Sequence, residues 1–256
     1  MQLFLQVQSM ELPQKPVIVR QVFRDELEYE FRLIQSVILE YPLVSIDTEY
    51  PNTIFKADKE IIALRDEHIN YQYMKSNIDI LDMTQLGLTF SDYEGNLPDF
   101  DTPFCYIWEF NFKGFRKNKK KGIDSRDFAT MFWNLGLFNY FRGLTWMAFH
   151  GSYDFGFLVK VLIQQSLPND LDSFMGLLVS LLGDKIFDVK HNLKCFGLLG
   201  SLDKVARELN VVRLTGLSHQ AGSDSLLTLQ CFTELRKLNA FEGFQVLALA
   251  LYGLQL

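Results

Sequence analysis

The sequence predicts a single α/β domain, in which a mixed β-sheet carries helices on both faces. Residues 78–90 and 104–112 alternate apolar and polar side chains and flank a polar turn, which indicates an antiparallel pair of strands. Further along, short apolar strands alternate with helical segments, a pattern typical of strand–helix–strand units. The chain has 256 residues, enough to bury one large core, and it contains no internal repeat or interdomain linker.

The N-terminal half begins with an amphipathic helix, because Leu27, Phe31 and Ile34 recur on one face and Pro42 ends the segment. An apolar run rich in branched residues follows and predicts a buried strand. The expected elements are a helix at 24–41, a strand at 41–46, an irregular stretch at 51–67, a short helix at 69–77, a strand at 78–90, a turn at 91–96 and a strand at 104–112.

The C-terminal half contains strands that run directly into helices. Ser125 is expected to be the N-cap of the first helix, and Ser201 precedes another capped helix. The expected elements are a helix from 125, a strand at 144–150, helices at 153–164 and 171–182, a strand at 186–189, a helix at 201–209, a helix entered at Gly222-Ser223 and ending near 238, and a helix at 241–251.

The composition is that of an ordinary globular protein, with 48% hydrophobic and 22% charged residues. Cys105, Cys195 and Cys231 are widely spaced, which fits a reducing compartment and argues against a disulfide framework or a zinc site. No segment approaches the ~20 apolar residues of a membrane helix. The N-terminus has no basic start or small-residue cleavage site, so no secretory signal is expected. We therefore expect an intracellular protein that does not bind a membrane.

The formal net charge of −6 argues against a protein that grips nucleic acid over a broad basic face. It does not exclude an enzyme that binds nucleic acid through metal ions, because two divalent cations would offset four carboxylates. Residues 116–121 include five basic side chains. We expect an exposed loop there, with RNA contact as the less favoured alternative.

Asp47 and Glu49 directly follow the predicted strand at 41–46. Side chains of a strand alternate between its faces, so these two carboxylates are expected to point the same way. At the end of a core strand they would repel each other and lose hydration, and protons, cationic side chains or metal ions would have to neutralise them. An isolated pair of this kind is more often two solvated loop acids, so the rest of the chain must decide.

Three further residues complete a candidate set. Asp154 follows a core strand, at the kind of junction where functional residues gather, although alone it would simply favour the helix dipole. Asp224 is expected in the first turn of a helix, with His219 on the approach, where an imidazole could transfer a proton. Carboxylates suit Mg²⁺ or Mn²⁺, and two such ions ~3.5–4 Å apart can assist an in-line phosphoryl displacement.

The order D-x-E, then a distant D, then H-x₄-D resembles the DEDDh exonucleases, which share an RNase H-like fold. More closely, the chain resembles the CAF/Pop-type deadenylases of the CCR–NOT complex, as a divergent member of the kind that plants keep in several copies. The matching stretches follow the family order: YPLVSIDTEYP (41–51), YQYMKSNIDILDMTQLGLTFSD (71–92), WEFNFK (108–113), YDFGFLVK (153–160), FDVKH (187–191), HQAGSDSLLT (219–228) and LYGL (251–254).

The resemblance implies roles for all five residues. Asp47, Glu49 and Asp224 would hold one of two divalent ions, Mg²⁺ or Mn²⁺, with Asp47 bridging, Asp154 serving the second ion and His219 as general base. It also implies a metal-dependent 3′→5′ exoribonuclease, which shortens mRNA poly(A) tails and releases AMP. Its partners would be a NOT-type scaffold and a CCR-type second deadenylase, in the cytoplasm and nucleus. The nuclease domain would span residues 21–256, after an N-terminal extension at 1–20.

Four features depart from the family pattern, and one of them is the segment at 114–124, which is shorter and more basic than usual. Tyr50 stands where the family favours phenylalanine, Asn52 where it favours glycine, and Gly151-Ser152 reverses its usual serine–glycine order. Moving the glycine is expected to change the backbone where φ > 0 is needed. Two alternatives therefore stay open: a DEDDh exonuclease that trims other RNA or DNA ends, and a weakly active or non-catalytic interaction subunit.

Overall fold

The computed structural model describes residues 15–64, 66–114, 118, 120–193, 197–237 and 248–254. Within these residues, six strands form one mixed sheet in the order β1-β4-β3-β2-β5-β6. The strands are β1 (Val17–Val22), β2 (Leu43–Glu49), β3 (Gln85–Ser91), β4 (Cys105–Asn111), β5 (Thr145–Ala148) and β6 (Ile186–Asp188). The β2–β3 and β3–β4 pairs are antiparallel, whereas β1–β4, β2–β5 and β5–β6 are parallel.

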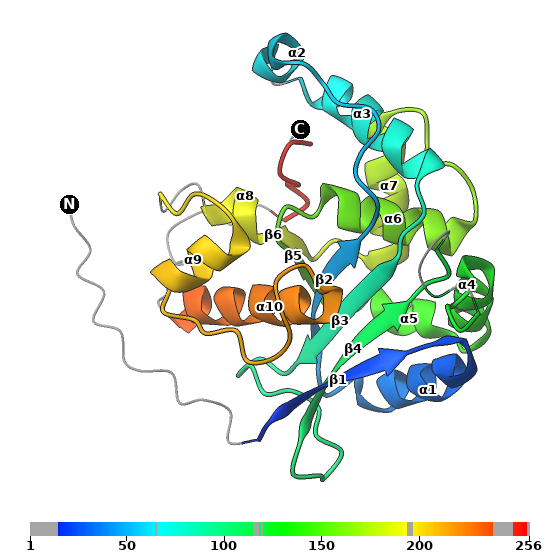
Figure 1. The fold of residues 1–256 in the computed structure, drawn as a ribbon, viewed down its shortest axis with the longest axis vertical. Helices are drawn as coiled ribbons and strands as arrows, with labels where there is room; N and C mark the ends of the chain where they lie inside the picture. The colour runs from blue at the N-terminus through cyan, green and yellow to red at the C-terminus, as the bar shows by residue number, and fades with distance from the viewer. Residues whose placement is uncertain are drawn as a thin grey trace.

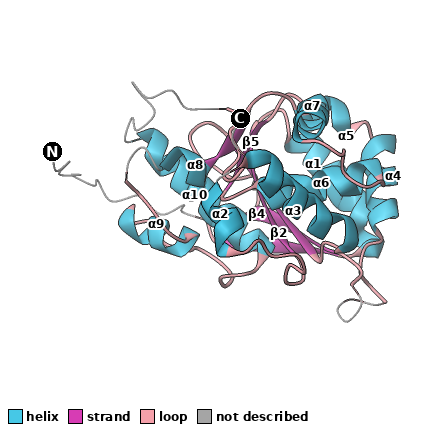
Figure 2. Ribbon diagram, turned by 90° about the horizontal axis from the view of Figure 1, so that it is seen from above, coloured by secondary structure: helices cyan, strands magenta, loops and turns pink. Residues whose placement is uncertain are grey.

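Helices cover both faces of this sheet, so the predicted α/β architecture is confirmed (Figures 1 and 2). One face carries η1 (Arg24–Glu26), α1 (Leu27–Val37), α3 (Glu67–Ile80), α4 (Ser125–Asn134), α5 (Leu137–Phe141), α6 (Ser152–Ile163) and α7 (Leu171–Leu182). The other face carries α8 (Val189–Leu193), α9 (Leu202–Glu208) and α10 (Ala221–Lys237). The short helix α2 (Lys59–Leu64) projects beyond α3 at the top of Figure 1. No described helix is both long and apolar enough to cross a lipid bilayer.

Four expectations about the elements need correction. The expected strand at 78–90 begins only at Gln85, because α3 continues to Ile80. Ile78 and Ile80 alternate as the residues of a strand would, but both belong to the helix, where Ile78 is buried and Ile80 is largely exposed. Strand β1 lies partly inside the range 1–20 that was assigned to an extension. The N-cap of α4 is Asp124, whose carboxylate accepts from the Arg126 N–H.

The fourth correction is that the stretch at 51–67, expected to be irregular, contains helix α2. Most of the expected helix at 241–251 lies outside the described residues. Leu251 itself forms an isolated bridge with Leu254. Three residues of the basic run at 116–121 also lie outside the described residues, so the expected exposed loop and the alternative of RNA contact both stay predictions.

A buried ion pair fastens the outer strand β1 to the sheet. Glu30 on α1 accepts from the Nε and Nη2 of Arg20 on β1, each at 2.6 Å. The same carboxylate accepts from the indole N–H of Trp108 on β4 at 3.0 Å. Because all the donors converge on one shielded carboxylate, this contact holds β1, α1 and β4 together.

Helix α10 lies directly on the strands that carry the site. Gly87 on β3 pairs with Asp47 on β2, and a Cβ atom at position 87 would lie 1.9 Å from the Ala221 carbonyl oxygen. Ser45 donates to the Ser225 carbonyl at 2.6 Å, and the Thr89 and Ser225 hydroxyls are 2.8 Å apart. This close, polar contact explains why small residues open the helix, and it places the helix start beside Asp47.

Candidate active site

The end of strand β2 forms one wall of a pocket of about 390 Å³. Asp47 and Glu49 are partly exposed and line it, whereas Thr48 between them is buried. The strand continues through Glu49, so the alternative of two solvated loop acids is wrong. The other lining residues are Thr48, Tyr50, Pro51, Asn52, Thr53, His219 and Asp224.

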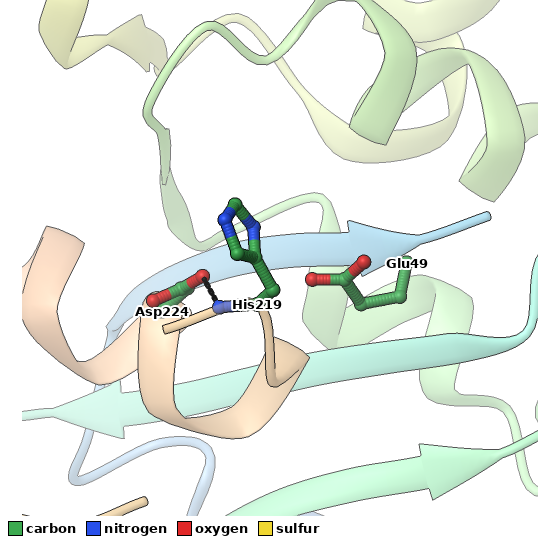
Figure 3. A group of neighbouring side chains, drawn as sticks. All are labelled: Glu49, His219 and Asp224. Atoms are coloured by element: carbon green, nitrogen blue, oxygen red, sulfur yellow. Dashed lines mark hydrogen bonds between the residues drawn. The ribbon is translucent and has the colours of Figure 1, made fainter. Parts of the chain in front are cut away.

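Glu49, His219 and Asp224 converge in this pocket, although they come from distant parts of the chain. Each offers one ligand atom, and these atoms all lie within 4.8 Å of one another. Figure 3 shows the imidazole between the two carboxylates, above the same stretch of β2. The His219 backbone N–H donates to Asp224 Oδ2 at 2.9 Å, and His219 has a left-handed φ of 65°. The turn before α10 therefore presents the ring beside both acids.

Asp154 lies behind Thr48 and does not line the pocket. It is in the first turn of α6, only 6% exposed. Its Oδ1 accepts from the Thr48 backbone N–H at 2.8 Å and from the Thr48 hydroxyl at 2.5 Å. Because Thr48 separates Asp47 from Glu49, these bonds hold Asp154 next to the pair. The structure thus assembles all five predicted residues around the end of β2.

Two carboxylates of the site, Asp47 and Asp154, have raised pKa values. Burial raises the pKa of Asp47 well above its usual range, and the charges of Asp154, Asp224 and Glu49 raise it further, while Arg213 opposes them. Burial also raises the pKa of Asp154 to about 7. The two hydrogen bonds from Thr48 oppose this rise, whereas the charge of Asp188 adds to it. The clustered carboxylates of this site therefore need positive charge to neutralise them. Divalent cations with oxygen ligands would supply it, so the residues fit Mg²⁺ or Mn²⁺.

The pocket wall beyond β2 is held by aromatic stacking and by one buried amide. Tyr50 stacks on Tyr153, with ring centroids 5.3 Å apart and planes at 12°. Burial and the charge of Asp154 raise the pKa of the Tyr50 hydroxyl, which keeps it neutral. Asn77 accepts from the backbone N–H groups of Ile54 and Phe55 at 2.8 and 2.9 Å. These contacts anchor the segment after Tyr50.

The reversed glycine does not have the consequence expected from the sequence. Positive φ falls on His150, at 67°, whereas Gly151 has φ −78°. Gly151 is needed for space, because a Cβ there would lie 2.3 Å from the Ala148 Cβ. The expectation was wrong because the left-handed residue precedes the small pair.

Two charged residues at the site were not singled out from the sequence. Asp188 is fully buried and accepts from the backbone N–H groups of His150, Gly151, His191 and Tyr252, at 2.9–3.1 Å. It therefore fixes the loop that leads to Asp154. Arg213 pairs with Asp224 at 2.5 Å. The FDVKH stretch contains Asp188 but gives no sign of its partners, and Arg213 belongs to no motif.

Comparison with known proteins finds close relatives, although no family model matches the chain. The chain is 37% identical over 272 aligned residues to the probable CCR4-associated factor 1 homolog 7 of Arabidopsis thaliana, covering 96% of each. It is 34% identical over 247 residues to the poly(A) ribonuclease pop2 of Schizosaccharomyces pombe, covering 88% of this chain and 71% of that protein.

Two solved structures share the fold. One is S. pombe Pop2p in its Mg²⁺- and Mn²⁺-bound form, with a TM-score of 0.79, 31% identity, and coverage of 92% of this chain and 99% of that chain. The other is the yeast NOT1 MIF4G domain co-crystallised with CAF1, with a TM-score of 0.73, 31% identity, and coverage of 87% and 90%. The fold is thus RNase H-like, as the sequence predicted. By sequence and by structure, the chain belongs to the CCR4-associated factor 1/Pop2 family.

Proposed function

We propose that this chain is a metal-dependent 3′→5′ exoribonuclease that shortens mRNA poly(A) tails and releases AMP. The observation that carries the proposal is the convergence of Glu49, His219 and Asp224 within 4.8 Å, in a pocket that Asp47 also lines. Asp154 is bonded to Thr48, which lies between Asp47 and Glu49 in the strand. Oxygen ligands and one imidazole in a pocket suit phosphodiester hydrolysis. The preference for adenylate rests on the relative named poly(A) ribonuclease.

Two divalent ions, Mg²⁺ or Mn²⁺, are the proposed cofactors, and both metals are named for the Pop2p structure. Asp47, Glu49 and Asp224 would hold one ion, with Asp47 shared between the two. Asp154, held by its two hydrogen bonds from Thr48, would serve the second ion. When bound, the ions neutralise the carboxylates and stabilise negative charge on the phosphate.

His219 is the proposed general base. Its side chain is exposed at the pocket and stands between two carboxylates, where it can take the proton from an attacking water. The hydrogen bond from its backbone to Asp224 sets the ring's position relative to the acids. The water attacks the phosphorus of the last phosphodiester at a free 3′ end, and the bond from that phosphorus to the 3′ oxygen of the preceding nucleotide breaks. That oxygen takes up a proton, and one nucleoside 5′-monophosphate is released per cycle.

The proposed partners are the mRNA poly(A) 3′ end, a NOT-type scaffold and a CCR-type second deadenylase. The scaffold is supported by the structural match to CAF1 bound to the NOT1 MIF4G domain. The second deadenylase is supported only by the name of the CCR4-associated relatives. We propose that the protein works in the cytoplasm and the nucleus, where such RNA is found.

A single assay tests the activity. Purified protein is incubated with 5′-labelled RNAs that end in A, U or C and with a circular RNA, in Mg²⁺, Mn²⁺ or chelator. We expect stepwise shortening of the A-ended RNA, its loss in chelator, and an intact circle. Cleavage of the circle, or full activity in chelator, would refute the mechanism. Equal rates on RNAs that end in A, U or C would refute the poly(A) preference but would still support exonuclease activity.

A further inference from the structure

Arg213 joins two carboxylates from different helices. Its Nη1 lies 2.5 Å from Asp224 Oδ1 on α10, and its Nη2 lies 2.8 Å from Asp203 Oδ1 on α9. The Arg213 and Asp224 side chains are 17% and 11% exposed, so water screens this pair far less than a surface ion pair. A planar guanidinium can serve two separate acceptors in this way, whereas a lysine ammonium lacks the fixed geometry.

The Asp203 carboxylate and the Arg213 guanidinium also hold the turn that carries His219. Asp203 Oδ2 accepts from the Ser218 hydroxyl at 2.9 Å. The Ser223 hydroxyl accepts from Arg213 Nη1 at 2.5 Å and donates to the Thr215 carbonyl at 2.7 Å. His219 adopts a left-handed backbone that is uncommon for a residue with a side chain, so its surroundings must hold it there.

We infer that Arg213, fixed by Asp203, is a positioning residue for this active site. It orients the Asp224 carboxylate toward Glu49, and it holds the turn between α9 and α10 so that His219 faces the same space. The inference rests on the proposed function of the pocket and adds two residues, Arg213 and Asp203, that do not line it. Replacing either residue should therefore impair cation binding and turnover together.

The direction in which Arg213→Met changes the Mn²⁺ affinity separates a positioning role from a purely electrostatic one. A positive charge beside the carboxylates repels a divalent cation, so charge alone predicts that Arg213→Met binds Mn²⁺ more tightly. Loss of orientation predicts weaker binding. Residues that support metal ligands typically contribute 10–100-fold to metal affinity or activity, and we expect about tenfold weaker Mn²⁺ binding for Arg213→Met.

The test measures Mn²⁺ binding to the full chain by electron paramagnetic resonance, with kcat and KM on A-ended RNA. The variants are Arg213→Met, Asp203→Ala and the pair combined. Arg207→Met is the matched control, because Arg207 lies on α9 and its guanidinium donates to the backbone carbonyl of Asp203 and not to the Asp203 carboxylate. Asp203→Asn tests for rescue, since its amide oxygen can still accept from Arg213.

We expect both single variants to bind Mn²⁺ about tenfold more weakly and the double variant to be no worse than either, because the two residues act as one unit. KM should stay within about threefold while kcat falls 10–100-fold. Arg207→Met and Asp203→Asn should resemble the parent. Should Arg213→Met fail to fold, Asp203→Ala and Asp203→Asn decide by the same two measurements.

Three results would overturn the inference: unchanged or tighter Mn²⁺ binding by Arg213→Met, equal weakening by Arg207→Met, or a raised KM with unchanged kcat, which would mean direct contact with RNA. A parent protein that binds Mn²⁺ but leaves RNA intact would refute the proposed function. The Mn²⁺ affinities of the variants would still decide whether Arg213 positions the site.

Discussion

Gly87 on β3 lies against the Ala221 carbonyl at the start of α10, so closely that a Cβ atom at position 87 would be 1.9 Å from the carbonyl oxygen. Gly87 is also the strand partner of Asp47. The absence of one side chain therefore sets the distance between β2, which carries two of the acids, and the helix that carries Asp224. Any side chain at 87 must move the two apart.

Gly87→Ala should lower both stability and activity. Overpacking a core contact typically costs about 1–3 kcal/mol, and the shift of α10 should reduce kcat at least tenfold. Urea unfolding and single-turnover rates measure the two effects. Gly176→Ala on α7 is the control, because a Cβ there meets nothing within 4 Å, and it should be neutral or stabilising. Parent-like activity in Gly87→Ala would show that the contact does not set the site.

Asp47→Ala and His219→Ala should fail in different ways. Asp47→Ala should lose metal binding and chemistry together, because the shared ligand is gone. His219→Ala should still bind metal, with a rate ~10²–10⁴-fold lower. Its residual rate should rise with pH, because hydroxide can replace a water that needs a base. Calorimetric metal titration and single-turnover rates from pH 6 to 9 make the comparison. A fully active His219→Ala would contradict the assignment of the base.

The raised pKa of Asp154 predicts how stability depends on pH without metal. Its folded-state pKa of about 7 exceeds the ordinary 3.8, so the folded protein favours the neutral acid. Below about pH 4 Asp154 is neutral in both the folded and the unfolded state and does not lower the free energy of unfolding. As the pH rises from about 4 to about 7, its ionisation lowers the free energy of unfolding progressively. In chelator, the parent should lose stability relative to Asp154→Asn across this range, by a few kcal/mol at most. Urea unfolding of both proteins at several pH values measures the difference.

Saturating Mn²⁺ should reverse this trend for the parent, because the metal binds the ionised carboxylates and its affinity rises with pH. Parallel stability curves for the parent and Asp154→Asn in chelator would contradict the raised pKa. Asp188, which contributes to that pKa, is left unchanged in both proteins.

Glu30→Ala should be among the most destabilising changes outside the site. It would leave the Arg20 guanidinium and the Trp108 indole N–H without their buried acceptor. Breaking a buried pair from one side costs about 3–5 kcal/mol. Glu28→Ala is the matched control on the same helix, because its pair with Arg32 is more than half exposed and contributes under about 1 kcal/mol. Equal midpoints of urea unfolding for the two variants would contradict the structural role.

The sequence by itself determined the type of most elements and the chemical set. Apolar periodicity located α1, β2, β4 and α7, because an amphipathic helix or a buried strand must repeat its apolar residues. The sequence also identified Asp47, Glu49, Asp154, His219 and Asp224 as a group, because these residue types suit metal-assisted chemistry and their order resembles that of the DEDDh exonucleases. The same reasoning failed at residues 78–80, where alternation in a helix imitated a strand.

Only the tertiary structure decided how the set is held. Asp154 meets Thr48 across 106 positions of sequence, Asp188 collects backbone donors from three segments, and Arg213 links α9 to α10. Such contacts leave no periodic trace, because a hydrogen bond between distant residues needs only one suitable atom at each end. Their existence depends on how closely α10 and α6 pack on β2, and that distance is a property of the assembled core.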